Sequence, residues 1–527
     1  MKICCAFWVI LFATILLGIP PTAAADSCEG LSGLTLPDTT ITLAQSVAAG
    51  AFALPKTAGV VVNGNVAVSL MPPPASLQEI TFKDLPAFCR VAVNIKPSKD
   101  SDIKVEVWMP ASGWNGRFMA VGNGGWAGSI SYALMNWPLA RGYATASTDT
   151  GHEGTNLDGS FALGHPEKLI DFGDRAVHEM TVKAKAIIAA YYQTDPKFSY
   201  WNGCSTGGRQ GLKEARRFPA DFDGIVAGAP ANNWTHLDAQ FLWVAQAVHK
   251  DQVSYIPPNK YPFIHNAVLE ACDARDGVKD GVLEDPRRCK FDPKVLECKG
   301  ADGPACLTGP QVEVARKIYG ASTNPRTRQR IYPGLMAGSE LGWGAQAGPQ
   351  IQGLTNDYFR YVVFKDPNWD YMTFNFDSDI ALTDQTDNGT INATDPDLST
   401  FFAHGGKLIQ FHGWSDNQIS PLNSINYYES VSEAMGGASR VQDSYRLFMI
   451  PGMGHCGGGV GVNRFDSISV VEQWVEKGKA PDQIIASRVR DGKTDRTRPL
   501  CPYPQVAKYK ETGSTDDAKN FVCTKEK

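Results

Sequence analysis

The fold is decided by the stretch Phe198-Ser-Tyr-Trp-Asn-Gly-Cys-Ser-Thr-Gly-Gly208. Its beginning, Phe198 to Trp201, predicts a short strand, and the segment Gly207 to Phe218 predicts a helix. Ser205 lies between them in a Gly-x-Ser-x-Gly pattern, and glycine suits both flanks because side chains would clash in so tight a turn. The pattern predicts a nucleophile elbow with Ser205 as the candidate nucleophile. A glycine-rich turn without chemistry is the alternative.

Two backbone N–H groups are expected to face the nucleophile. The helix after Ser205 would direct its first free N–H groups, including that of Thr206, toward a developing negative charge. A second donor should come from a glycine-rich loop after an early strand. Gly122-Asn-Gly-Gly-Trp126 follows the predicted strand Phe118 to Val121. Gly124 or Gly125 is therefore the expected second donor of an oxyanion hole.

A base and an orienting acid can be assigned by their order along the chain. Asp416 lies in the polar turn after the predicted strand Lys407 to Phe411, and His455 follows the predicted last strand, Tyr445 to Ile450. In a hydrolase with an elbow serine, the triad runs serine, then acid, then histidine. We therefore expect Ser205, Asp416 and His455 to form the triad. His412 is the alternative base, but it precedes the acid.

Two cysteines flank these candidates. Cys204 immediately precedes Ser205, and Cys456 immediately follows His455. A disulfide between them would hold their Cα atoms about 6 Å apart. Such a bond would make the serine and the histidine neighbours and would clamp the catalytic geometry. The alternative chemistry, Cys204 as a thiol nucleophile, would need a free cysteine.

The order of the predicted elements indicates one α/β domain with a large insertion. Short strands alternate with amphipathic helices up to Gly228-Ala-Pro230 and again after Lys407, which indicates a mostly parallel sheet covered on both faces. The intervening segment has little β periodicity. We therefore expect an α/β-hydrolase fold with a lid domain inserted between late strands. The expected limits are 26–231 for the first part of the core, 232–397 for the lid and 398–527 for the rest.

The start of the chain predicts export. Residues 1–25 comprise Lys2, an apolar run from Ile3 to Ile19 and the small residues Ala23-Ala-Ala25, the layout of a cleavable signal peptide. A transmembrane anchor is the alternative. The ten remaining cysteines are an even number, which favours disulfides in a secreted or periplasmic protein. The net charge of −5, with no basic block, argues against nucleic acid or a membrane as partner of the mature chain.

At these motifs the sequence resembles the tannase and feruloyl esterase family. The resemblance rests on Gly203-Cys-Ser-Thr-Gly-Gly-Arg209, Gly413-Trp-Ser-Asp416 and Pro451-Gly-Met-Gly-His-Cys456, and it covers nearly the whole mature chain. It extends to relatives of mono(hydroxyethyl) terephthalate hydrolase. It implies a bond between Cys204 and Cys456 beside the triad. For the other cysteines we expect the pairs Cys28–Cys89, Cys272–Cys289, Cys298–Cys306 and Cys501–Cys523, although spacing alone does not fix connectivity.

An acidic loop suggests a calcium site. Asp273, Asp276 and Asp280 are closely spaced with glycines between them, and carboxylate oxygens in a sharply turning loop suit Ca²⁺. A solvated acidic loop would have the same sequence. The family resemblance implies a structural calcium here, with three aspartate carboxylates and the backbone carbonyls of Val278 and Val282 as ligands. No organic cofactor is expected.

The substrate is expected to be a small aromatic ester. The predicted lid is rich in aromatic residues, which suit flat acyl groups, although any one ring can instead belong to the lid's own core. Phe359 and Arg360 are the candidate substrate contacts, and a surface ion pair is the alternative for Arg360. Feruloyl-type esters come first, and galloyl esters or mono(hydroxyethyl) terephthalate are the alternatives. A peptidase or a non-catalytic binding protein would be the other classes.

Overall fold

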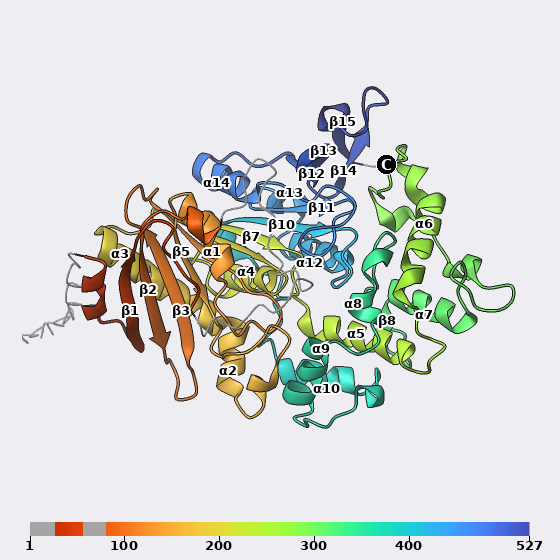
Figure 1. Ribbon diagram of the computed structural model, residues 1–527, viewed down its shortest axis with the longest axis horizontal. Coiled ribbons are helices and arrows are strands. Elements are labelled where there is room, and N and C mark those ends of the chain that lie inside the picture. The colour runs from red at the N-terminus through yellow and green to blue at the C-terminus, as the bar shows by residue number, and fades with distance from the viewer. Residues whose placement is uncertain (1–26, 56–80, 526–527) are drawn as a thin grey trace, which may run out of the picture.

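The structure, a computed structural model, describes residues 27–55 and 81–525, and the expected leader at 1–25 lies outside them. One nine-stranded sheet extends from the left side of the molecule to its middle in the view of Figure 1, in the order β1-β2-β3-β5-β4-β6-β7-β10-β11. Its strands, in chain order, are β1 (Thr39–Val47), β2 (Phe88–Ile95), β3 (Ile103–Pro110), β4 (Arg117–Val121), β5 (Ala144–Thr148), β6 (Phe198–Cys204), β7 (Gly224–Gly228), β10 (Lys407–Gly413) and β11 (Tyr445–Ile450).

The sheet changes from antiparallel to parallel at β5. Strands β1, β2, β3 and β5 pair antiparallel, whereas β5, β4, β6, β7, β10 and β11 pair parallel. Parallel strands need crossover connections, and helices supply them here. The carboxyl ends of parallel strands meet at one edge of the sheet, so the turns after β4, β6, β10 and β11 converge there.

Helices cover both faces of the sheet. Successive strand residues face opposite sides: Trp201 belongs to the core beneath α3 (Ala176–Tyr192), α4 (Thr206–Arg217) and α12 (Pro421–Ala434). Its neighbour Tyr200 belongs to the core beneath α14 (Ser467–Lys477). The predicted α/β-hydrolase arrangement is therefore confirmed.

The insertion lies between β7 and β10 and occupies the right of the view in Figure 1. It contains mostly short helices, and its two short strands, β8 (Ser322–Thr323) and β9 (Arg330–Tyr332), pair with each other. The α-helices between β7 and β10 are α5 (Trp234–Val248), α6 (Tyr261–Cys272), α7 (Gly309–Tyr319), α8 (Gly344–Ala347), α9 (Gly353–Asp357), α10 (Asp379–Asp387) and α11 (Ser399–Ala403). The domain limits at 232 and 397 stay a prediction.

The C-terminal region adds two hairpins that the periodicity did not indicate. They are β12 (Ile484–Arg490) with β13 (Lys493–Leu500), and β14 (Gln505–Tyr509) with β15 (Phe521–Lys525). Within residues 27–55 and 81–525, no helix has the length and apolar character required to cross a membrane.

Candidate active site

Ser205 occupies a strained turn between β6 and α4. Its backbone has φ +62° and ψ −120°, in the left-handed half of conformational space that residues other than glycine rarely adopt. The flanking glycines are sterically required. A Cβ at Gly203 would lie 2.5 Å from the carbonyl oxygen of Gly207, and one at Gly207 would lie 3.2 Å from that of Asn123. This strand–turn–helix geometry is that of a nucleophile elbow.

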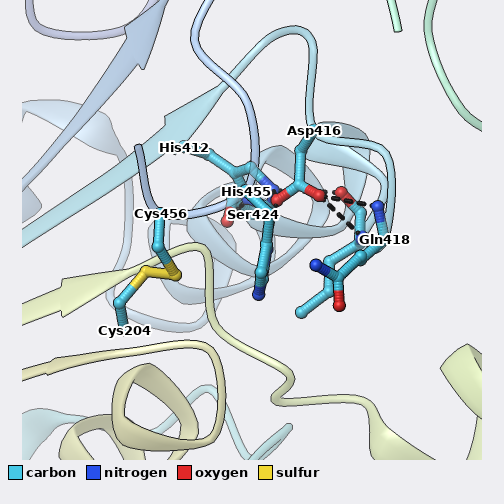
Figure 2. The surroundings of a disulfide bond; sticks show 8 residues. Cys204, His412, Asp416, Gln418, Ser424, His455 and Cys456 are labelled. Atoms are coloured by element: carbon cyan, nitrogen blue, oxygen red, sulfur yellow. Dashed lines mark hydrogen bonds and ion pairs between the residues drawn. A yellow bond between two sulfur atoms is a disulfide. The ribbon is translucent and has the colours of Figure 1, made fainter. Parts of the chain in front are cut away.

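Asp416 and His455 are hydrogen-bonded to each other. Asp416 follows β10 and is fully buried, and its Oδ2 lies 2.7 Å from Nδ1 of His455 (Figure 2). Its Oδ1 accepts hydrogen bonds from the backbone N–H groups of Gln418 and Ile419, at 2.8 and 2.9 Å. The carboxylate is therefore fixed in orientation and directed at the imidazole.

The electrostatics of Asp416 favour its charged form. Burial alone would raise its pKa, but the opposing charge of His455 and the hydrogen bonds from His412 and His455 hold that pKa far below its usual range. A carboxylate that stays ionised can stabilise a positively charged imidazole beside it.

His412 is a second partner of the same carboxylate. Its Nε2 lies 3.1 Å from Oδ2 of Asp416 and 3.1 Å from the carbonyl oxygen of Ile419, and its Nδ1 lies 2.7 Å from Oγ of Ser424. The ring is fully buried at the end of β10. The order of residues along the chain argued against His412 as the base, because it precedes Asp416. That order did not predict a hydrogen bond between His412 and Asp416.

A disulfide joins the turn of Ser205 to the loop of His455. Cys204 and Cys456 are bonded, with their Cα atoms 6.0 Å apart, and Figure 2 shows this bond beside His455. The serine and the histidine are each one residue away from the bridge. The bond excludes Cys204 as a free thiol nucleophile.

The loop after β4 approaches the beginning of α4. Oγ1 of Thr206 donates a hydrogen bond of 2.7 Å to the carbonyl oxygen of Gly125, and the N–H of Gly207 donates one of 2.8 Å to that of Asn123. Among the hydrogen bonds of the described residues, none uses the backbone N–H of Thr206, Gly124 or Gly125 as a donor. All three predicted oxyanion donors therefore lie at one junction.

All five expected disulfides are present. They include the bridge between Cys272 and Cys289, which encloses the acidic loop. The others beside the catalytic clamp are Cys28–Cys89, Cys298–Cys306 and Cys501–Cys523.

The acidic loop contains buried carboxyl groups whose charged forms are disfavoured. Burial raises the pKa of Asp276 to about 6, and the charges of Asp280 and Asp273 add to the effect. Burial likewise raises the pKa of Glu284 to about 8. A cavity of about 20 Å³, lined in part by Asp276 and Glu284, adjoins the loop. The lining also includes Arg275 and Arg288, whereas Asp273 and Asp280 are not part of it, and a calcium ion in this loop stays a prediction.

The rest of the loop is tied to the C-terminal hairpin. The carboxylate of Asp280 pairs with Arg496, at 3.2 Å, and with Arg498. Asp273 accepts a hydrogen bond of 2.9 Å from the N–H of Gly281. The side chains of the two predicted carbonyl ligands, Val278 and Val282, are buried.

The two candidate substrate contacts lie on one turn of the lid. Phe359 is fully buried, and its ring centroid lies 4.9 Å from that of Phe374 and 5.6 Å from that of Trp369. Arg360 donates a hydrogen bond of 3.3 Å to the carbonyl oxygen of Trp369. Phe359 thus packs in the core of the lid, and a role of either residue in substrate binding stays a prediction.

Known proteins resemble the chain over most of its length. The family described as tannase and feruloyl esterase matches residues 89–524. An uncharacterized esterase of Xanthomonas campestris pv. campestris is 39% identical over 95% of this chain and 92% of its own. The probable feruloyl esterase B-1 of Aspergillus fumigatus is 36% identical over 83% of this chain and 85% of its own.

Solved structures of a feruloyl esterase and a tannin acyl hydrolase also resemble the chain over most of its length. Feruloyl esterase B from Aspergillus oryzae superposes with a TM-score of 0.85 at 31% identity, covering 94% of this chain and 99% of that one. Tannin acyl hydrolase from Aspergillus niger shares the fold, with a TM-score of 0.75 at 24% identity over 93% of this chain and 92% of that one. The chain belongs to the tannase and feruloyl esterase family of carboxylic ester hydrolases.

Proposed function

We propose that the chain hydrolyses esters of aromatic acids, foremost feruloyl-type esters, through an acyl-enzyme on Ser205. His455 is the general base and Asp416 the orienting acid. One observation carries the proposal: the imidazole of His455 is held at 2.7 Å by the buried carboxylate of Asp416, on a loop bonded covalently to the residue before Ser205.

The reaction proceeds in two halves. His455 takes the proton of the Ser205 hydroxyl as the oxygen attacks the ester carbonyl, and returns that proton to the leaving alcohol. It then takes a proton from water, whose oxygen attacks the acyl-enzyme, and passes that proton to Oγ of Ser205 as the acid is released. Asp416 holds Nδ1–H of the imidazole throughout, so that Nε2 exchanges the protons, and its negative charge stabilises the imidazolium.

The oxyanion of each tetrahedral intermediate is stabilised by backbone N–H groups. The N–H of Thr206 and that of Gly124 or Gly125 would donate to it, and the partial positive charge at the beginning of α4 adds to their effect. Donors fixed by the fold before the substrate arrives would lower the reorganisation needed in the transition state.

The aromatic composition of the lid next to the oxyanion loop supports an aromatic acyl group as the substrate class. The lid core that contains Trp234, Tyr358 and Phe359 also contains Trp126, which directly follows the oxyanion loop. Relatives named feruloyl esterase B and a structural neighbour named tannin acyl hydrolase support the same class. Galloyl esters or mono(hydroxyethyl) terephthalate remain the alternative substrates of the same site.

Steady-state kinetics on three esters test the proposal: methyl ferulate, methyl gallate and mono(hydroxyethyl) terephthalate. Ser205→Ala should abolish turnover of the preferred ester, whereas Ser430→Ala, which alters an exposed hydroxyl on α12, should leave it unchanged. Full activity in Ser205→Ala would disprove the assignment of the nucleophile. A wild-type enzyme that cleaves none of the three would disprove the substrate class.

We further propose a structural Ca²⁺ in the acidic loop, held by carboxylates of Asp273, Asp276 and Asp280 and by the carbonyls of Val278 and Val282. The proximity of the three carboxyl groups supports it, because the charges of Asp280 and Asp273 contribute to the raised pKa of Asp276. The ion would stabilise the loop and takes no part in the chemical steps.

We also propose that the protein is exported to the periplasm or the medium after cleavage at Ala25. The five disulfides support an oxidising compartment. Sequencing the N-terminus of the protein recovered from the medium or periplasm tests this. A mature chain starting at Asp26 is the expected result, and a retained leader would contradict it.

A further inference from the structure

We infer that Trp126 is a positioning residue that connects the lid to the oxyanion loop, and so makes the rate of ester cleavage depend on the lid's packing. The inference rests on the proposed function, because it concerns the geometry of the oxyanion donors. Trp126 follows Gly124 and Gly125 directly in the chain, and its side chain is fully buried.

The indole of Trp126 is bound within the lid. Its Nε1–H donates a hydrogen bond of 3.1 Å to the carbonyl oxygen of Leu354, in α9 of the lid. Its ring centroid lies 5.0 Å from that of Trp234 and 6.4 Å from that of Tyr358, both in the insertion. On the side of the core, the centroid of Phe172 lies 5.0 Å away. The indole is therefore enclosed by lid and core together.

The fit around this indole leaves no room for displacement. A Cβ at Gly159 would lie 2.9 Å from the indole Nε1, closer than real Cβ contacts. The backbone is equally constrained, because the N–H of Trp126 donates to the carbonyl oxygen of Asn156 at 2.9 Å. A Cβ at Gly125, where φ is +52°, would lie 2.0 Å from that same oxygen. A shift of the indole must therefore be transmitted to the loop's backbone.

The other side of the loop is tied to the helix of the nucleophile. Gly125 accepts the hydrogen bond from Oγ1 of Thr206, and Asn123 accepts that from the N–H of Gly207. Gly124 lies between these ties, and nothing lies within 4 Å of the position where its Cβ would be. The position of its N–H therefore depends on its two flanks, the helix on one side and Trp126 on the other.

A displaced donor should slow the chemical step rather than weaken substrate binding. The oxyanion forms only in the transition state, so a misplaced N–H lowers kcat while the ground-state complex is hardly affected. Errors of an ångström in such geometry can cost up to about a hundredfold in rate.

Trp126→Phe tests the tie to the lid, because it keeps an aromatic ring but removes the indole N–H. With the preferred aromatic ester, we expect kcat per titrated active site to fall about tenfold, with KM within about twofold of wild type. Trp243→Phe is the matched control, since Trp243 lies on α5 of the same lid cluster and its indole N–H has no partner among the described residues. It should leave kcat unchanged.

Gly159→Ala provides a second test that leaves Trp126 itself intact. The added methyl group should displace the indole and lower kcat with the same KM signature. Gly154→Ala is its control, because the nearest atom to a Cβ there lies 3.9 Å away. A wild-type kcat per active site in folded Trp126→Phe or in folded Gly159→Ala would overturn the inference, as would an equal loss in the control.

The tie to the helix is tested at Thr206. Thr206→Val keeps the backbone N–H but removes the hydroxyl, and should lower kcat about tenfold, whereas Thr206→Ser should restore it. If the contacts of Trp126 and of Thr206 both position the same loop, kcat of the double variant Trp126→Phe, Thr206→Val should fall by less than the product of the two single reductions. Strictly multiplicative losses would overturn the shared role.

Inhibitor binding separates positioning from a general loss of structure. An aryl boronic acid, which forms a tetrahedral anion on the serine, should bind Trp126→Phe about tenfold more weakly than wild type, while the free product acid should bind equally. Equal weakening for both would overturn the inference. Failure of the proposed function is a distinct result, namely a wild-type enzyme without esterase activity.

Discussion

At the scale of single residues, Asp416 has two histidine partners with different positions. His455 lies in the glycine-rich loop after β11, and its hydrogen bond of 2.7 Å with Asp416 orients the imidazole. His412 lies inside β10, with both ring nitrogens already engaged. We therefore assign proton exchange with the substrate to His455, and support of the carboxylate to His412.

Two substitutions separate these roles. Asp416→Asn should lower kcat about ten-thousandfold, because an amide favours the wrong tautomer of His455 and cannot stabilise its cation. His412→Ala should lower kcat only about tenfold, since Asp416 retains its backbone N–H donors. Steady-state kinetics on folded variants measure both. A loss in His412→Ala as large as that in Asp416→Asn would contradict the assignment of the base.

The sequence identifies Ser205, Asp416 and His455 as a candidate triad because each follows a strand end in a fixed order. Ser205 was recognisable from its glycines, and His455 and Asp416 from the strands before them. The support by His412 was not predictable, because it depends on a contact four residues along the chain that only the turn after β10 creates. Phe359 was proposed as a substrate contact from the aromatic composition of the lid. Composition does not distinguish an aromatic ring in the core of the lid from one that lines a pocket.

At the scale of elements, the bond between Cys204 and Cys456 joins the carboxyl end of β6 to the loop after β11. These elements are 252 residues apart in sequence, so the bond removes much freedom from the unfolded chain. Because the bond adjoins both Ser205 and His455, we propose that it also fixes the placement of the base relative to the nucleophile.

Removal of this bridge should therefore affect rate as well as stability. The double variant Cys204→Ser, Cys456→Ser should lower both Tm and kcat, the latter about a hundredfold. The double variant Cys501→Ser, Cys523→Ser removes the bridge in the terminal hairpin β14–β15, and should lower Tm alone. Calorimetry and kinetics on both proteins check this, and an unchanged kcat in the first would refute the clamp.

Asp238 of the lid helix α5 should make stability depend on pH. Burial raises its pKa to about 8, and its hydrogen-bonding side-chain partner is Thr355. The folded state thus keeps a proton that the unfolded chain loses near pH 4, so stability is lost progressively as pH rises from about 4 to about 8. In Asp238→Asn, the urea midpoint should fall less between pH 5 and pH 9 than in wild type. The exposed control Asp482→Asn should follow wild type, and parallel curves for all three would contradict the expectation.

The parallel strands and the alternating strand β3 were predictable, whereas the edge strand β1 and the C-terminal strand β13 were not. Strands β4, β6, β7, β10 and β11 are short apolar runs between turn residues, a pattern typical of a buried parallel sheet. Strand β1 lies at the edge of the sheet and is largely solvent-accessible. Strand β13 contains the charged run Lys493-Thr-Asp-Arg-Thr-Arg498, whose arginines Arg496 and Arg498 pair with Asp280. A strand stabilised by ion pairs across the molecule leaves no apolar alternation to detect.

At the scale of the whole molecule, the acidic loop is the point where lid and C-terminal region meet. Asp280 pairs with Arg496 and Arg498 of β13, and Glu284 accepts a hydrogen bond of 2.8 Å from the N–H of Ala507 in β14. Order in this loop therefore contributes to the attachment of the lid.

Withdrawal of calcium should loosen that attachment. Treatment with a chelator should lower Tm by several degrees, and added CaCl₂, but not MgCl₂, should restore it, because ligand binding to the folded state alone raises its stability. Asp276→Asn should have a low Tm that no longer responds to calcium, whereas the exposed Asp292→Asn should respond as wild type does. Differential scanning calorimetry measures the response, and a Tm indifferent to chelator would refute the site.

The neighbouring strands β7 and β10 explain how so large an insertion is tolerated. They pair directly, with Gly224 opposite Lys407, although 182 residues separate these two positions (407 − 224 − 1). The chain leaves the sheet at the carboxyl end of β7 and re-enters it at the beginning of β10, the adjacent parallel strand, so the insertion is part of one crossover connection. Insertions of different length can therefore occupy this connection while the hydrogen bonds between β7 and β10 stay intact. Replacement of the insertion can thus change the substrate preference while the strand-end turns that carry Ser205, Asp416 and His455 are kept.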